Sequence, residues 1–79
     1  MARCPVGMQV QSLVFDREEF TRAEARAWAK RHGYQHEGLD VKPGTYRIRQ
    51  KHPRAFQSGT FRTIHFGSGI EAVVACPAR

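Results

Sequence analysis

Residues 20–33 constrain the fold more than any other part of the chain, because they carry a complete set of helix signals. Thr21 and Glu24 have the spacing of a capping box, in which each side chain accepts a hydrogen bond from the backbone N–H of the other residue. Gly33 provides the left-handed conformation at which helices commonly end. The sequence therefore predicts one helix of about three turns between Thr21 and Gly33.

One face of this predicted helix is apolar and must be covered by another part of the fold. Its members recur at helical spacing and are Ala25, Trp28, Ala29 and His32. Trp28 is the largest of them, so we expect it to be the buried anchor that holds the helix on a sheet. We expect His32, at the helix end, to cover part of the indole ring.

The first strand is predicted at residues 8–15, which are rich in β-branched and aromatic side chains. The alternation of this segment slips near Gln11 and Ser12, which indicates either a bulge or partial cover of both strand faces. The preceding residues 1–7 contain proline and glycine without periodicity, so we expect a loose lead-in.

Three more strands are predicted in the second half of the chain. Residues 45–50 alternate, so that Tyr46 and Ile48 face the helix and the arginines between them face the other way. Residues 60–66 and 70–76 are separated by a Gly-Ser-Gly turn, which is typical of a β-hairpin.

The remaining segments are predicted to be loops. Residues 34–44 hold two glycines and a proline with little apolar material, and residues 51–59 are broken by a proline, with Phe56 as their anchor. The predicted order is β-α-β-β-β. We expect one domain over residues 1–79, of the α+β class, with an antiparallel sheet and one α-helix packed across one face.

The charge of the chain favours an acidic partner. The formal net charge is +6, with a pI near 10.2. Residues 40–79 carry seven Lys/Arg against two Asp/Glu, a net charge of +5, whereas residues 1–39 carry six against five, a net charge of +1. This balance indicates contact with nucleic acid, a nucleoprotein or an acidic protein surface. The alternative is a solvated basic surface that only aids solubility.

The strongest candidate for function is a group of basic residues in the second half of the chain. The predicted partner-binding residues are Arg47, Arg49, Lys51, Arg54 and Arg62. If the strands that carry them pair, several guanidinium groups converge on one surface and suit bidentate contact with phosphates or carboxylates.

Two observations bear on how this basic group would be used. In the alternative interpretation, one or two of its members pair with Glu37, Asp40 or Glu71 and merely stabilise the sheet. Binding of nucleic acid through a sheet usually adds exposed aromatic side chains for stacking. The candidates for stacking are Tyr46, Phe61 and Phe66, which we expect to lie in the core instead.

No residue pattern indicates catalysis, a metal or a cofactor. The four histidines lack a Cys-x-x-Cys partner motif, and the glycines form neither a phosphate-binding nor a dinucleotide-binding loop. Cys4 and Cys76 lack a flanking nucleophile signature; we expect them to be reduced, with a disulfide as the alternative if the first and last strands are neighbours. We expect no enzyme activity, no cofactor and no small-molecule substrate.

The sequence also bears on where the protein acts. It contains no apolar run long enough to span a membrane, and its start lacks the pattern of a signal peptide. We therefore expect a cytoplasmic protein that does not contact a membrane.

Several motifs occur together in a recognisable order. They are A-x-A-W-x-x-x-H-G at residues 25–33, Y-R-I-R-Q at 46–50, F-R-T-I at 61–64 and G-I-x-A-V at 69–73. In this order the chain resembles, over residues 15–75, a small module of phage and prophage proteins that often accompanies head-morphogenesis proteins. The resemblance implies an origin in a mobile element and offers no catalytic residue to carry over. Its recurrent polar positions correspond to Arg47, Arg49, Gln50 and Arg62.

The leading hypothesis is a non-enzymatic phage or mobile-element protein that binds a host protein or nucleoprotein complex in the host cytoplasm. By analogy with other small basic phage proteins, we expect an anti-CRISPR inhibitor that occludes the surface of a nucleoprotein effector. The competing hypothesis is an accessory protein of phage head assembly or a small nucleic-acid-binding module.

Overall fold

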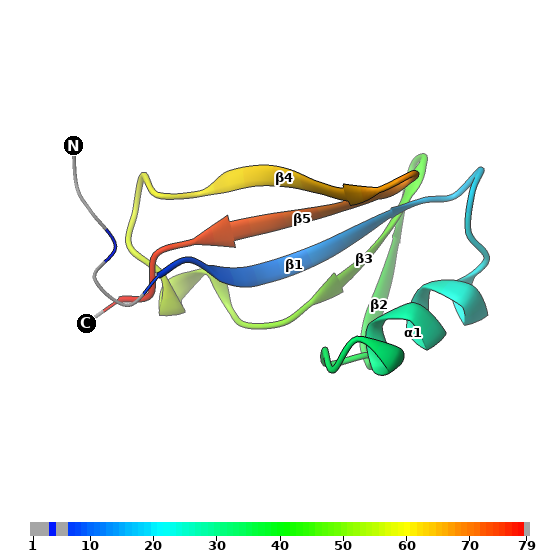
Figure 1. The fold of residues 1–79 in the computed structure, drawn as a ribbon, viewed down its shortest axis with the longest axis horizontal. Coiled ribbons are helices and arrows are strands. Elements are labelled where there is room, and N and C mark those ends of the chain that lie inside the picture. Colours follow the sequence, from blue (N-terminus) through cyan, green and yellow to red (C-terminus); the bar gives the residue numbers. More distant parts are fainter. Residues whose placement is uncertain (1–3, 5–6, 79) are drawn as a thin grey trace.

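The computed structural model describes Cys4 and residues 7–78. In this part of the chain, five antiparallel strands form one sheet that is accompanied by one α-helix (Figure 1). The elements are β1 (Gln9–Asp16), α1 (Arg22–Arg31), β2 (Leu39–Lys42), β3 (Thr45–Arg49), the short 3-10 helix η1 (Pro53–Ala55), β4 (Arg62–Gly67) and β5 (Ile70–Ala75). The spatial order of the strands is β2-β3-β1-β5-β4. The predicted α+β class is confirmed.

The helix α1 begins and ends as its sequence predicts. Thr21 Oγ1 accepts a hydrogen bond from the Glu24 backbone N–H at 3.1 Å, and the Glu24 carboxylate accepts one from the Thr21 N–H at 2.8 Å. Two of the N–H groups at the helix start are therefore satisfied by side chains. Gly33 follows the last turn with φ of +80°, a conformation that favours glycine.

Thr21→Ala removes the capping hydroxyl and is expected to lower the free energy of unfolding by about 1 kcal/mol. The measurement is the urea midpoint followed by circular dichroism. Ser68→Ala, in the exposed turn between β4 and β5, is the control, because a surface change of this kind usually stays within about 0.5 kcal/mol. A loss for Thr21→Ala no larger than that for Ser68→Ala would contradict the capping role.

The two faces of the sheet differ in cover, because α1 lies on one side only (Figure 1). We call the covered side the helix face; its buried residues are Leu13, Phe15, Ile48, Ile70, Ala72 and Val74. The opposite side is the open face, and its residues include Ser12, Val14, Arg47, Arg49, Thr63, His65, Glu71 and Val73. No α-helix of the described residues covers the open face.

Phe15, rather than Trp28, is at the centre of the core. The side chain of Phe15 is 0% exposed, whereas Trp28 is half-buried and meets Phe15 edge-on, with ring centroids 5.8 Å apart. The prediction that Trp28 is the buried anchor is therefore wrong, since Trp28 is only half-buried. The small side chains of Ala25 and Ala29 are fully buried instead, and they bring α1 close to the sheet. As predicted, the His32 ring stacks on Trp28, with centroids 3.9 Å apart.

The segment predicted as a loop at residues 34–44 contains the strand β2. Leu39–Lys42 pairs with β3, and Pro43 and Gly44 form the two-residue connection between them. Proline followed by a glycine with φ of +80° is the residue pair of a type II turn. The prediction of a loop over the whole of residues 34–44 is therefore wrong for residues 39–42, because four residues are too few to reveal a strand.

The register within the sheet confirms two local predictions. The pairing of β1 with β5 shifts between Val10 and Ser12, which agrees with a bulge, one of the two alternatives for the slip near Gln11 and Ser12. The hairpin of β4 and β5 forms around Gly67 and Gly69, as predicted.

Cys4 and Cys76 form a disulfide, with Cα atoms 5.4 Å apart, so the expectation of reduced thiols is corrected. The reason is topological: β1 and β5 are neighbours and Gln9 lies opposite Ala75, which brings Cys4 beside the end of β5. The loose lead-in predicted for residues 1–7 falls mostly on residues 1–3 and 5–6, outside the described residues.

In the part of the chain that the structure describes, no helix has the length and apolar character needed to cross a membrane.

Candidate partner-binding surfaces

The first candidate surface is a row of basic side chains along β3. Arg47 and Arg49 lie on the open face, because Ile48 between them is fully buried on the helix face. Lys51 lies in the bend just after the strand, and its Nζ donates a hydrogen bond at 2.9 Å to Oε1 of Gln9 on β1. Alternate residues of a strand are about 6.8 Å apart. Arg47, Arg49 and Lys51, which we call the β3 row, thus place three positive charges on or beside the sheet face that α1 does not cover.

No ion pair within 4.0 Å accompanies the charges of the β3 row among the described residues. The close nitrogen–carboxylate contacts found there involve histidine rings, namely His36 with Glu37 at 3.8 Å and His65 with Glu71 at 3.4 Å. Asp40 lies opposite Arg47 in the register, yet no described lysine or arginine has a carboxylate oxygen within 4.0 Å. In the alternative interpretation, one or two of these basic residues pair with nearby carboxylates. The described residues contain none of the ion pairs that this interpretation requires.

Arg62 does not join the β3 row. Its register partner is Val74, which places Arg62 on the helix face, opposite to Arg47 and Arg49. In addition, β1 and β5 lie between β3 and β4, so three strand spacings, about 14 Å, separate the two strands. The predicted convergence of Arg62 with the β3 arginines is wrong, because β3 and β4, although consecutive in sequence, are not neighbours in the sheet.

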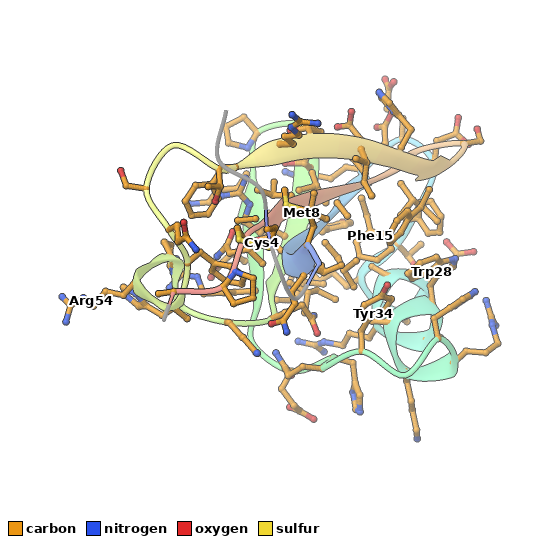
Figure 2. All side chains as sticks on the ribbon, turned by 60° about the vertical axis from the view of Figure 1, so that its left-hand side comes forward. Cys4, Met8, Phe15, Trp28, Tyr34 and Arg54 are labelled. Atoms are coloured by element: carbon orange, nitrogen blue, oxygen red, sulfur yellow. A yellow bond between two sulfur atoms is a disulfide. The ribbon has the colours of Figure 1, made fainter. Side chains whose placement is uncertain are left out.

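Arg54 also lies apart from the β3 row. It belongs to η1, beyond the end of β3, and Figure 2 shows its side chain pointing away from the rest of the molecule. The local structure is fixed by His52, whose Nδ1 accepts a hydrogen bond from the Arg54 N–H at 3.1 Å. The five predicted residues therefore occupy three places, of which only the β3 row groups several of them.

Two carboxylates, those of Asp16 and Glu71, lie elsewhere on the open face. A shallow hollow of about 340 Å³ lies at the end of the sheet where β1 leads toward α1, and its walls include Asp16, Thr45, His65 and Glu71. This hollow thus holds the carboxylates of Asp16 and Glu71, whereas the cationic side chains of the open face follow β3. Among the described residues, no group of three His, Cys, Asp or Glu side chains is placed to hold a metal ion.

The second candidate surface, on β4, was missed by sequence reasoning. Phe61 and Phe66 were expected in the core, but they are 40% and 38% exposed, and Ile64 is 38% exposed. Tyr46 packs against the core as expected, with the Arg17 guanidinium 5.3 Å from its ring centre. The apolar content of β4 was visible in the sequence, but its position at the edge of the sheet was not.

No protein-family model, curated protein or solved structure matches this chain. The resemblance to a phage module therefore remains a prediction that rests on the motifs alone.

Proposed function

We propose that this chain is a non-enzymatic binding protein of phage or mobile-element origin that occludes an anionic surface of a host nucleoprotein effector, in the manner of an anti-CRISPR protein. The observation that carries the proposal is the β3 row: three cationic side chains on or beside the sheet face that α1 does not cover, with no carboxylate oxygen of the described residues within 4.0 Å. The origin and the class of partner are supported by the motif resemblance and by the net charge of +6.

The β3 row is presented by a rigid part of the molecule. β3 is hydrogen-bonded to β1 on one side and to β2 on the other. The end of β3 is fixed further, because Gln50 Oε1 accepts from the Gln35 N–H at 2.8 Å and Gln35 Nε2 donates to the Arg49 carbonyl at 2.9 Å. Charged groups held on a rigid backbone lose less conformational entropy when they bind, which favours affinity for a complementary surface.

The experiment mixes the purified protein with candidate effector complexes and measures how much target DNA each complex still binds. We expect the protein to reduce DNA binding by at least one complex in a dose-dependent manner. The control is DNA alone with the same amount of protein, which should remain unbound at the same salt concentration. Unchanged DNA binding by every complex tested would contradict the proposed inhibition.

A second function, a small nucleic-acid-binding module such as a head-assembly accessory, is favoured by the exposed rings of Phe61 and Phe66. In that case the protein binds bare DNA directly, and affinity falls steeply with salt because phosphate contacts release counterions. For three phosphate contacts, the logarithm of the binding constant should change with the logarithm of salt concentration with a slope of about −2.7. Tight binding to bare DNA with this slope would replace the effector proposal.

A further inference from the structure

The outer edge of β4 is an unused strand-pairing surface. β4 is the last strand of the sheet, all six of its residues are exposed, and no described segment pairs with its outer side. The opposite edge strand, β2, has four residues, of which Asp40 and Lys42 are charged. Short length and charge protect an edge strand from pairing with other chains. β4 is longer, and Arg62 is its one Asp, Glu, Lys or Arg residue.

Three large apolar side chains accompany this edge. Ile64 lies opposite Ala72 and therefore on the helix face. The Phe66 ring contacts Trp28 and Tyr34, with centroids 6.0 and 6.4 Å away, and the Phe61 ring meets Phe56 at 6.0 Å. Each ring is held from inside the molecule and still exposed by more than a third. These side chains offer apolar area at low entropic cost to a segment laid beside β4.

The start of β4 adds a hollow with a cation at its wall. The hollow has a volume of about 320 Å³ and is lined by side chains that include Met8, Phe61 and Arg62. Met8 is 41% exposed, and Figure 2 places it beside Cys4. No described carboxylate lies within 4.0 Å of Arg62. A ligand that carries an apolar side chain next to a carboxylate matches this hollow, because its walls are apolar and its charge is positive.

We propose that the β4 edge binds an extended acidic segment of a partner protein as a sixth strand of the sheet. The backbone of that segment pairs with β4, its apolar side chains lie beside Ile64 and Phe66, and a carboxylate lies opposite Arg62. Such strand addition draws affinity from main-chain hydrogen bonds and specificity from alternate side chains. This surface is separate from the β3 row, so the two proposals can fail independently.

An acidic partner fits this edge better than a second copy of the chain does. If two copies of β4 paired antiparallel around Ile64, Arg62 would lie opposite Phe66 and would still have no carboxylate beside it. Two chains that each carry a net charge of +6 would also repel each other. A partner strand with a glutamate at this position supplies the missing charge.

The test uses synthetic peptides and the full chain. The peptide TVTVTEFT, paired antiparallel, places its valines beside Phe66 and Ile64 and its glutamate beside Arg62. Amide chemical shifts of the labelled protein should change saturably at residues 61–67. A peptide with lysine in place of glutamate should bind about fivefold more weakly, the size of a cross-strand charge effect of about 1 kcal/mol.

Substitutions separate this proposal from the alternatives. Arg62→Glu, at an exposed position, should reverse the preference, so that the lysine peptide binds more tightly than the glutamate peptide. Ile64→Lys should remove binding, while Val41→Lys, at a similarly exposed position on the other edge strand, should leave it unchanged. The triple charge reversal of the β3 row should also leave peptide binding unchanged.

Three results would overturn the proposal. The first is the absence of saturable binding of the glutamate peptide. The second is a peptide preference that Arg62→Glu leaves unaltered, a result that can be read even if Ile64→Lys fails to fold. The third is a dimer of the unmodified chain, seen by sedimentation, that Ile64→Lys dissociates, because the edge would then be occupied by a second copy whose Ile64 lies against the first.

Discussion

Phe15→Ala is expected to lower the free energy of unfolding by about 3–5 kcal/mol, the range for removing a large aromatic side chain from a core. Phe15 is 0% exposed and lies on the central strand β1, opposite Tyr46 on one side and Ile70 on the other. Its ring also meets Phe20, with centroids 5.3 Å apart. The loss combines the transfer of apolar surface to water with the cavity left between α1 and the sheet. Urea unfolding followed by circular dichroism measures it.

Trp28→Ala is the matched comparison, because it removes a larger ring from a less buried position. Trp28 is half-buried and contacts Phe15, Tyr34 and Phe66 along its ring faces and edges. We expect a smaller loss of stability than for Phe15→Ala, and unchanged inhibition of the effector complex by the folded fraction. A Trp28→Ala loss equal to or larger than that of Phe15→Ala would contradict the placement of the core centre at Phe15.

Local signals in the sequence predicted local structure well. The capping box of Thr21 and Glu24 depends on residues three positions apart, and both of its hydrogen bonds are present. The alternation in β3 likewise depends on neighbours within one strand, and it correctly placed Ile48 on the helix face. The fold class followed from these elements, because one amphipathic helix and several strands leave few other ways to bury the apolar faces.

The order of strands could not be predicted in the same way. β1 and β5, from the two ends of the chain, occupy the middle of the sheet, and this arrangement separates β3 from β4. The alternation of side chains along one strand says nothing about the next strand, because the connecting loop interrupts the period of two. The sequence therefore did not determine whether Arg62 lies on the same face of the sheet as the β3 arginines. The exposure of Phe61 and Phe66 depends on the same arrangement. β4 is an edge strand, whereas an identical strand in the middle of the sheet would have a neighbouring strand along each edge.

Reversal of the β3 row is expected to have the largest effect on partner binding. Arg47→Glu, Arg49→Glu and Lys51→Glu together replace three positive charges by three negative ones on the open face. Close charge contacts at an interface strengthen affinity, and like charges placed against each other cost several kcal/mol. We expect the apparent affinity for the effector to fall at least about a hundredfold, which corresponds to about 2.8 kcal/mol.

The matched control carries the same charge change on α1. Arg22, Arg26 and Lys30 are exposed residues of this helix, which lies on the helix face and away from the β3 row. Their replacement by glutamate lowers the net charge by the same amount, so any general effect of charge on association is common to both variants. Urea unfolding of both triple variants establishes that each is folded at the temperature of the binding assay.

The most direct test is an inhibition titration of the unmodified chain and the two triple variants against a DNA-binding effector complex at one salt concentration. We expect the helix variant to inhibit within about threefold of the unmodified chain, while the β3 variant requires at least about a hundredfold more protein. Equal inhibition by the β3 variant and the helix variant, with both folded, would contradict binding of the anionic surface through Arg47, Arg49 and Lys51.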